Sequence, residues 1–578
     1  MGDTAATMLR TVGCSLASLA IASLALAQSA REPIPLERAA RPTAKGSKLQ
    51  KGKRGAKSDA GRPKLVVLLV IDQFRLDYLE RFARDFGEGG FRRMLRDGAV
   101  FEGRYGQQNT YTGPGHALLA SGSYAYMNGI MQNKWWNRTT GQSESMLFDP
   151  KAVLHDGSHA AEDETSPRNF QGSTVGDELL LASPRSKVVA LALKDRGAIL
   201  LGGRMGQAYF QSEQNGDFIA STYYAPAVPD WARAFNAQKL PDQAFGKLWE
   251  RALPADRYPE RDDHPNEGDL KGMGRTFPHR LTGKLKAPGP DFYSVFQHSP
   301  YGLDLTFAFA RAALDGEQLG QRGVTDLLGI SITPTDYVGH TFGPYSQEVH
   351  DIVVRTDRAL ERFLRELDRR FGGEVLVVLA ADHGATPVPE WSAEHKLDGH
   401  RVKKAQLKDA IEKALAARFG EGKWVLALED PSVYLDWALI DKKRLDHAEV
   451  ERTAGEAAST VEGIQGYFTR TQLLHGWLPP TPIARAVARS YVPKRSGDVV
   501  LLQSPFSFWG KYGEKDWGDT HGSPYRYDTD VPLVFLGKGV VPGRRGAAEM
   551  VDVAATLARR LGLPMPAACE GEPLPIDR

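Results

Sequence analysis

The sequence predicts an α/β fold with a central, mostly parallel sheet and helices on both faces. Three short runs rich in Val, Leu and Ile, at residues 64–71, 327–332 and 375–379, are typical of strands that are buried on both faces of such a sheet. Between the second and third runs, residues 347–371 place apolar side chains at spacings of three and four, as an amphipathic helix does. Strand, helix and strand in this order predict a βαβ unit.

Carboxylate or imidazole side chains follow closely after each of the three runs. Asp72 comes directly after the first, Asp336 and His340 follow the second, and Asp382 and His383 follow the third. Because open α/β sheets bind ligands at the carboxyl ends of their strands, we expect these side chains to meet. Oxygen and imidazole ligands suit zinc or a similar divalent ion, and there are more of them than one ion needs. Any one of them alone would equally be a turn cap or an ordinary histidine.

A further candidate ligand lies late in the chain. The run Val499–Leu502 predicts another short strand, and the polar turn at residues 518–523 follows it. His521 lies in this turn. We therefore add His521 to the candidate metal ligands.

The candidate nucleophile lies in a loop at residues 109–116, which is rich in Gly, Thr and Pro and precedes a helix-like apolar run at 117–120. A threonine hydroxyl such as that of Thr112 is a poor nucleophile at neutral pH and needs a base or a metal ion to activate it. A pair of metal ions would do this. The alternative for Thr112 is a helix cap or a turn hydroxyl.

The order of these motifs resembles that of the alkaline phosphatase superfamily, and more closely its threonine-nucleophile branch. This branch includes type I phosphodiesterases/nucleotide pyrophosphatases and periplasmic broad-specificity alkaline phosphatases. The resemblance covers roughly residues 63 to 565 and implies an alkaline phosphatase-like fold. It also implies that Thr112 is phosphorylated during turnover. By resemblance, two zinc ions are held by two sets of ligands: Asp336, His340 and His521 for one, and Asp72, Asp382, His383 and the Thr112 oxygen for the other.

The treatment of the nonbridging phosphate oxygens separates monoesterases from diesterases. A monoester dianion carries more charge than a diester, and additional cations therefore stabilise it more, since charge-assisted hydrogen bonds to phosphate are strong. Lys194 and Arg196 follow a strand-like run at 188–193, and alternation along a strand predicts that both point to one side. They resemble the phosphate-binding Lys and Arg of the monoesterases, and Asn133 resembles the family asparagine that donates to a phosphate oxygen. The alternative for the Lys and Arg is a solvated turn.

The resemblance implies a metal-dependent hydrolase of small phosphate monoesters that acts through a phosphothreonine on two zinc ions. A phosphodiesterase or nucleotide pyrophosphatase remains the alternative, since it shares Thr112 and every ligand. A sulfatase is not expected, because position 112 is Thr rather than Cys or Ser. A noncatalytic protein that binds phosphate or metal would be indicated by the loss of Thr112 or of a ligand, and none is lost.

The amino terminus predicts the compartment. Residues 1–27 have Arg10, an apolar stretch and an Ala-Leu-Ala cleavage site, which together indicate a secretory signal peptide and a periplasmic or secreted protein. The stretch is too short for a membrane span, and we expect no stable membrane anchor. After cleavage only Cys569 would remain, which excludes an internal disulfide.

Residues 28–62 predict a basic, disordered linker without apolar periodicity. The segment 31–64 holds eleven basic and three acidic residues while the whole chain has a net charge of only +2, so the rest is mildly acidic. This argues against nucleic acid as a partner. We expect a monomer with one catalytic domain at 63–578, in which insertions at about 135–300 and 400–490 form a cap.

Overall fold

The computed structural model describes residues 61–577, so the predicted signal peptide and nearly all of the predicted linker lie outside the described part of the chain. A nine-stranded sheet forms the centre of the described part, with the strand order β17-β2-β16-β11-β1-β10-β5-β6-β7. The strands are β1 (Leu65–Ile71), β2 (Ala99–Arg104), β5 (Val188–Ala192), β6 (Gln207–Gln211), β7 (Phe218–Ile219), β10 (Asp326–Ile332), β11 (Val375–Ala381), β16 (Asp530–Gly537) and β17 (Gly543–Glu549).

The sheet is mostly parallel, as predicted. Strands β11, β1, β10, β5 and β6 run in one direction, and β16 and β7 run against their neighbours. The three apolar runs noted in the sequence are β1, β10 and β11, which are adjacent strands with β1 in the middle. Every residue of the three strands is buried. Burial on both faces explains why these strands are continuously apolar rather than alternating.

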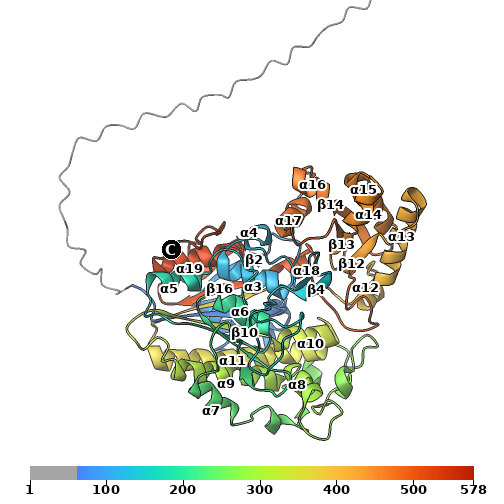
Figure 1. Ribbon diagram of the computed structural model, residues 1–578. Helices are drawn as coiled ribbons and strands as arrows, with labels where there is room; N and C mark the ends of the chain where they lie inside the picture. Colours follow the sequence, from blue (N-terminus) through green and yellow to red (C-terminus); the bar gives the residue numbers. More distant parts are fainter. Residues whose placement is uncertain (1–60, 578) are drawn as a thin grey trace, which may run out of the picture. The chain divides into compact units, whose positions relative to one another are not determined.

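Helices cover both faces of the sheet (Figure 1). One layer contains α9 (Pro300–Gly316), α10 (Pro334–Phe342) and α11 (Gln347–Phe371), and the other contains α3 (Thr112–Ser121), α5 (Val175–Ala182), α6 (Asp195–Gly202) and α19 (Asp552–Leu561). Other helices of this part of the chain are α1 (Tyr78–Arg81), α2 (Phe91–Asp97), α4 (Ala125–Asn128), α7 (Asp230–Asn236), α8 (Pro290–Gln297) and α18 (Arg526–Thr529).

Helix α11 is the predicted connection between β10 and β11, and its bounds are those expected from the apolar spacing. The Ser346 hydroxyl accepts a hydrogen bond from the Val349 amide and caps its first turn, and Gly372 ends it in a left-handed conformation with φ of 57°. The predicted βαβ unit is therefore confirmed.

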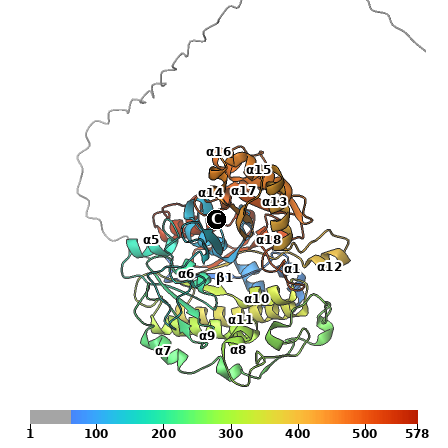
Figure 2. The ribbon, with the colours of Figure 1, turned by 45° about the vertical axis from the view of Figure 1, so that its right-hand side comes forward.

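A second, antiparallel sheet forms between the last two ligand-bearing segments, with the strand order β12-β13-β15-β14. Its strands are β12 (Val425–Glu429), β13 (Ser432–Leu435), β14 (Ile464–Thr469) and β15 (Val499–Gln503), and its helices are α13 (Lys404–Phe419), α14 (Trp437–Lys442), α15 (His447–Ala458), α16 (Arg470–His475) and α17 (Pro482–Ser490). In Figures 1 and 2 these helices lie away from α9 and α11. We call residues 403–503 the cap unit.

The run Val499–Leu502 is a strand, β15, but it belongs to the cap unit rather than to the central sheet. Its four apolar residues are compatible with any buried strand, so the run alone did not indicate the sheet. The cap unit also extends past residue 490, the expected end of the insertion, because β15 pairs with both β13 and β14.

The expected insertion at 135–300 is interrupted by the central strands β5, β6 and β7. The remainder of that range holds two short hairpins, β3 (Lys134–Asn137) with β4 (Gln142–Ser145) and β8 (Leu248–Trp249) with β9 (His279–Arg280). Among residues 61–577, no helix combines the length and the apolar composition that a membrane crossing requires.

Candidate metal centre and nucleophile

The register of the central strands aligns the candidate ligands. Ile71, the last residue of β1, pairs with Ile332 of β10 and with Ala381 of β11. Asp72 and Asp382 therefore leave the sheet side by side. After β10 the chain turns directly into α10, whose first turn carries Asp336 and whose last turn carries His340.

Thr112 is the first residue of α3 and is almost fully buried. Helix α3 approaches the end of β11 so closely that a Cβ atom on Gly115 would lie 2.4 Å from the backbone oxygen of Asp382. The Thr112 hydroxyl oxygen lies 3.5 Å from Nε2 of His383. Thr110 is held elsewhere, because its hydroxyl donates to the Ser523 carbonyl.

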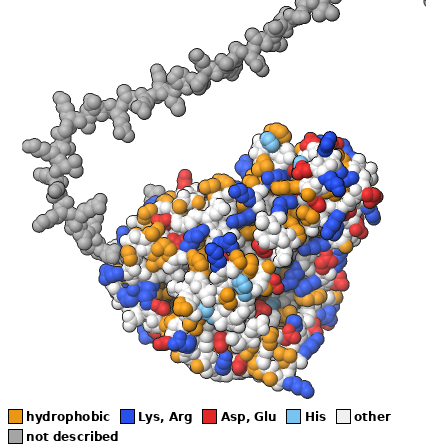
Figure 3. All heavy atoms as spheres, viewed as in Figure 1, with side chains coloured by type: hydrophobic (Ala, Val, Ile, Leu, Met, Phe, Trp, Pro, Cys, Tyr) orange, Lys and Arg blue, Asp and Glu red, His pale blue; other side chains and the backbone are white. Residues whose placement is uncertain are grey.

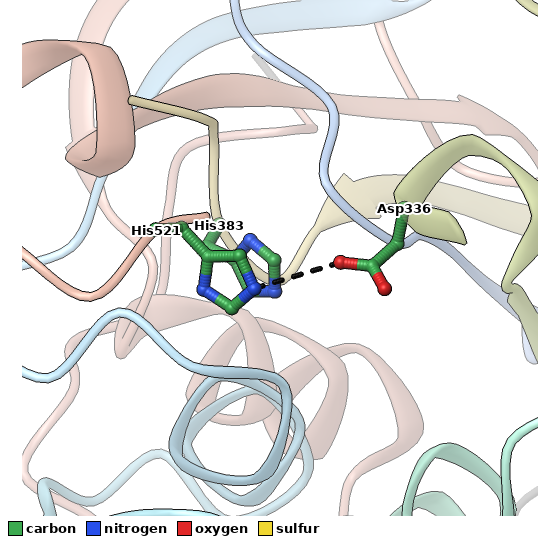
Figure 4. A group of neighbouring side chains, drawn as sticks. All are labelled: Asp336, His383 and His521. Atoms are coloured by element: carbon green, nitrogen blue, oxygen red, sulfur yellow. Dashed lines mark ion pairs between the residues drawn. The ribbon is translucent and has the colours of Figure 1, made fainter. Parts of the chain in front are cut away.

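Two groups of potential ligands share His383. Asp72, Asp382 and His383 each offer a ligand atom within 4.8 Å of the others, and so do Asp336, His383 and His521. Figure 4 shows the rings of His383 and His521 stacked, with Asp336 opposite them. The ring centroids are 3.5 Å apart, and His521 Nε2 lies 3.5 Å from Asp336 Oδ1.

His340 lies beside the second group but is not a member of it, because membership requires ligand atoms within 4.8 Å of one another. Its Nε2 atom is 3.4 Å from Asp336 Oδ1, and its ring centroid is 5.2 Å from that of His521. The structure thus brings all six predicted side-chain ligands and Thr112 together. It differs from the expected sets in placing His383 against Asp336 and His521.

The ligand groups fit divalent metal ions. One oxygen of each central carboxylate is buried and accepts no hydrogen bond from the described residues: Oδ1 of Asp72, Oδ1 of Asp336 and Oδ2 of Asp382. Buried carboxylate oxygens are normally paired, and those without partners cost free energy unless a cation binds them. Three carboxylates and three imidazoles are a donor set suited to zinc or a similar ion.

The pKa values reflect this crowding. Burial, together with Asp336 and Asp382, raises the pKa of Asp72 to about 6. Burial alone would lower the pKa of His383, but Asp382 and Asp72 outweigh it and raise that pKa to about 9. Burial and the adjacent His383 lower the pKa of His521 to about 4, which keeps its imidazole neutral, whereas His383 would have to lose a proton to bind a metal ion.

Lys194 connects the two ligand groups. Its ammonium nitrogen lies 2.7 Å from Asp72 Oδ2, 2.7 Å from Asp336 Oδ2 and 3.4 Å from the Thr112 hydroxyl oxygen. Burial would lower the pKa of Lys194, but Asp336 and Asp72 outweigh it and raise the pKa. This buried ammonium group therefore stays charged beside the nucleophile.

The prediction that Lys194 and Arg196 point to one side because they alternate along a strand is wrong. Strand β5 ends at Ala192, Lys194 precedes α6, and Arg196 lies in the first turn of that helix. Both side chains nevertheless line the same cavity, because the helix starts at the edge of the site. The Arg196 guanidinium lies 3.2 Å from Glu164 Oε1.

Asn133 lies on another side of the nucleophile. Its side-chain oxygen accepts a hydrogen bond of 2.9 Å from the Gly113 amide, next to Thr112. This bond orients the side chain with its NH₂ group as the end that remains for a ligand. Asn133 and Lys194 therefore contact the segment of Thr112 directly, and Arg196 lines the same cavity as both.

A cavity of about 720 Å³ opens over these residues. Its lining includes Asn133, Lys194, Arg196, Asp336 and His521, together with residues of the cap unit and of the segment 509–521. A second cavity, of about 390 Å³, is lined by residues around Trp391 and contains none of the candidate ligands.

Three supporting residues were missed in the sequence. His116 Nδ1 lies 2.9 Å from the Thr112 carbonyl oxygen and 3.2 Å from Asp382 Oδ2, and its Nε2 atom lies 2.9 Å from the Ser331 hydroxyl oxygen of β10. Asp519 is fully buried with its Oδ1 atom 3.6 Å from His340 Nδ1. Glu164 pairs with Arg196. His116 and Asp519 stand inside the motifs that named Thr112 and His521, whereas no pattern marks Glu164.

The fold and this site define a metal-dependent phosphoesterase, and the comparisons with known proteins agree. A family model described as type I phosphodiesterase / nucleotide pyrophosphatase matches residues 66–524. The chain belongs to this family.

Relatives extend over nearly the whole chain. A protein of Myroides odoratus named calcium-transporting ATPase is 36% identical, over 89% of this chain and 94% of that protein. Alkaline phosphatase PhoV of Synechococcus elongatus is 35% identical, over 88% of this chain and 92% of PhoV. Alkaline phosphatase PafA of Elizabethkingia meningoseptica is 33% identical, over 89% of this chain and 94% of PafA.

The crystal structure of PafA superposes with a TM-score of 0.82 at 32% identity and covers 89% of this chain and 98% of that one. A PafA variant with replacements at one Thr, one Asn, one Lys and one Arg gives the same TM-score. Its Thr and Asn, and its Lys and Arg, have the same separations along the chain as Thr112 and Asn133, and as Lys194 and Arg196.

The contact of Gly115 with Asp382 generates a first prediction. Gly115→Ala places a methyl group against backbone atoms that cannot rotate away, so α3 must shift relative to Asp382 and His383. We expect kcat for phosphoester hydrolysis to fall by about 100-fold, because displacements near 1 Å have effects of that size. Circular dichroism should show an unchanged helix content.

Gly466→Ala is the matched control, since a Cβ atom there would meet nothing within 4 Å. It should leave kcat unchanged. A Gly115→Ala enzyme with full kcat would show that the position of α3 against β11 does not limit the reaction.

Proposed function

We propose that this chain hydrolyses phosphate monoesters with Thr112 as the nucleophile. One observation carries the proposal: the Thr112 hydroxyl lies where two groups of metal ligands and the Lys194 ammonium group meet. The names of the relatives PhoV and PafA support a monoesterase. The relative named as an ATPase is consistent with transfer of a terminal phosphoryl group.

In the first half of the reaction, a bond forms between the Thr112 oxygen and phosphorus while the bond from phosphorus to the leaving oxygen breaks. In the second half, water hydrolyses the phosphothreonine and frees Thr112. Bound divalent ions would lower the pKa of the attacking groups and offset charge on the leaving oxygen. Lys194 and Arg196 hold the nonbridging oxygens of the transferred group, and Asn133 donates a third hydrogen bond to it.

We further propose two zinc ions per chain. Asp336, His340 and His521 would hold the ion on the leaving-group side, and Asp72, Asp382 and His383 the ion beside Thr112. The donor set and the buried oxygens without hydrogen-bond partners support metal binding here, and Asp72, Asp382 and His383 lie within ligand distance of one another as assigned. His340 is included in the other set because its Nε2 atom lies 3.4 Å from Asp336 Oδ1.

The monoester specificity rests on charge. Lys194 and Arg196 add two cations where a monoester dianion presents its nonbridging oxygens, and PafA was altered at a Lys and an Arg with the same separation. A phosphodiesterase or nucleotide pyrophosphatase is the second candidate, favoured by the description of the family model.

The location and partners rest on the sequence. The signal peptide predicted at residues 1–27 supports a periplasmic or secreted enzyme. We propose in addition that the enzyme acts on small phosphorylated substrates and that it is a monomer. On the face drawn in Figure 3, Lys and Arg side chains are interspersed with Asp and Glu. Such mixing supports the expectation that nucleic acid is not a substrate, because nucleic-acid binding needs a basic stripe or patch.

A second prediction tests the nucleophile. Thr112→Ala should lower kcat by roughly a thousandfold or more, because the group that attacks phosphorus is lost. Thr112→Ser keeps a hydroxyl and should retain measurable turnover. Acid quenching of the wild type during turnover should trap phosphate on Thr112, as detected by mass spectrometry.

Thr110→Ala is the control, since the Thr110 hydroxyl donates to a backbone carbonyl. Multiple turnover by Thr112→Ala within tenfold of the wild type would instead indicate direct attack by water.

A third prediction concerns metal content. His521→Ala should reduce zinc, measured by plasma mass spectrometry, from two ions to about one per chain, because a site with two side-chain ligands binds weakly. Activity should fall in parallel. The control is His298→Ala, because His298 lines the same cavity but lies outside both ligand groups. Unchanged zinc in His521→Ala would remove His521 from the ligand list.

A fourth prediction separates the two candidate functions. Replacing Lys194 and Arg196 with Ala should damage hydrolysis of an aryl phosphate far more than hydrolysis of its methyl diester. Each charged hydrogen bond is worth on the order of 1.5 to 3 kcal/mol, so the monoester kcat/KM should fall at least about 100-fold. Neighbouring contacts do not add fully.

Zinc content of the double variant is measured alongside, because Lys194 contacts two proposed ligands. Lys271→Ala removes a charge from the same cavity wall, where it pairs with Asp291, and should affect both substrates little. Equal losses on the monoester and the diester in the double variant would favour the phosphodiesterase.

A further inference from the structure

A second pair of cations lines the cavity that Lys194 and Arg196 also line. Lys511 and Lys515 lie in the segment that ends at His521, and both face the ring of Tyr512. The Lys511 ammonium nitrogen is 5.6 Å from the centre of that ring and the Lys515 nitrogen is 4.6 Å from it. The Lys515 nitrogen also lies 3.7 Å from the centre of the Trp517 ring. Among the described residues, neither lysine forms an ion pair with a carboxylate.

Hydrogen bonds from Arg401 hold this segment in place. Arg401 donates to the carbonyl oxygens of Tyr512, Trp517 and Gly518, at 3.0, 3.3 and 2.7 Å. The same guanidinium forms a two-pronged ion pair with Glu390 at 2.6 and 3.0 Å. The two lysines therefore extend from a fixed backbone rather than from a free loop.

Packing of Trp517 adds a second anchor. The ring lies so close to Gly268 that a Cβ atom on that glycine would be 2.3 Å from it. The Gly518 amide also donates to the Asn266 carbonyl at 2.8 Å. The aromatic surface beneath Lys515 is thus fixed from both sides.

The position of the pair relative to the reaction follows from Tyr512. Its ring stacks on His340, with centroids 4.5 Å apart and an angle of 11° between the planes. Under the proposed function, His340 belongs to the ligand set on the leaving-group side, whereas Lys194 and Arg196 serve the transferred phosphoryl group. Lys511 and Lys515 accordingly face the part of the substrate that leaves.

The charges around the pair favour an anion. Burial and the neighbouring Lys511 lower the pKa of Lys515 to about 8. Burial and Arg196 lower the pKa of Lys511, and they outweigh Asp336 and Glu213, which act in the opposite direction. Of the other lysines of the cavity, Lys271 pairs with Asp291 and Lys404 donates to the Leu428 carbonyl, whereas Lys134 has no ion pair among the described residues. A bound anion would relieve the mutual repulsion of two ammonium groups on one aromatic platform.

We propose that Lys511 and Lys515 form a subsite for a second phosphate group, carried by the leaving alcohol of the substrate. The inference rests on the proposed monoesterase activity and names its preferred substrate class: small alcohols that carry two phosphate groups. The reaction is ordinary hydrolysis, in which water and the bisphosphate give inorganic phosphate and an alcohol that keeps its second phosphate. No further reactant is needed.

The test compares alkanediol bisphosphates with the matching alkanediol monophosphates, in a series of chain lengths from propanediol to hexanediol. At the best length the wild type should prefer the bisphosphate by about tenfold in kcat/KM, beyond the statistical factor for two equivalent groups, as two partly desolvated charge pairs would give. Lys511→Gln combined with Lys515→Gln should abolish this preference and leave kcat/KM for the monophosphates within about twofold.

The matched control is Lys408→Gln combined with Lys413→Gln, which removes the same charge from exposed positions of α13 outside this cavity. It should keep the preference. The subsite is refuted if the wild type shows no preference at any length, if the Lys511/Lys515 variant keeps it, or if the control variant loses it equally.

A binding measurement separates failure of the subsite from failure of the proposed function. In a Thr112→Ala background, titration calorimetry with the propanediol-to-hexanediol bisphosphates should show tighter binding than with the monophosphates, and the lysine replacements should remove the difference. Tighter binding without hydrolysis by the wild type would sustain the subsite and refute the monoesterase. Hydrolysis of the monophosphates without any lysine-dependent difference in binding would sustain the monoesterase and refute the subsite.

Discussion

The arrangement of this site depends on forcing three carboxylates into one buried place at the end of a parallel sheet. Asp72, Asp336 and Asp382 are all fully buried, and each keeps an oxygen without a hydrogen-bond partner. Such a concentration of negative charge is unfavourable without cations, because desolvation and mutual repulsion both act against ionisation. The Lys194 ammonium group offsets part of it, and the geometry leaves the rest for bound ions. The proposed nucleophile Thr112 and the Lys194 ammonium group lie together beside these carboxylates.

The sequence predicted the centre of the fold because β1, β10 and β11 are buried on both faces. Strands of this kind are continuously apolar, and here each apolar run is followed by an Asp. Helix α11 was predictable as well, because its apolar residues recur at spacings of three and four. The candidate ligands could be located for the same reason, since strand ends and turns are local features of the chain. What the sequence did not contain was the pairing of His383 with Asp336 and His521, which depends on how three distant segments fold back on one centre.

Longer-range features were missed where several structures share one local pattern. Four apolar residues at Val499–Leu502 predict a strand but not the sheet to which it belongs, and β15 lies in the cap unit because its neighbours β13 and β14 supply the free edges. Lys194 and Arg196 line one cavity, but not through the expected strand alternation, since a helix start and a strand end can both present them to it. Glu164 was missed because a buried partner for an arginine has no sequence pattern at all.

The two sides of the cavity are built by different kinds of structure. The side that transfers the phosphoryl group comes from the ends of central strands and from the first turns of α3, α6 and α10, whose positions are fixed by the packed core. The side that would face the leaving group under the proposed function comes from the cap unit and from the segment that Arg401 holds through backbone carbonyls. Because Arg401 binds main-chain atoms, side chains at positions such as 511 and 515 can change without moving the ligands. Chemistry and substrate preference are therefore separable in this fold, and a change of preferred phosphoester needs no change in Thr112 or in the metal centre.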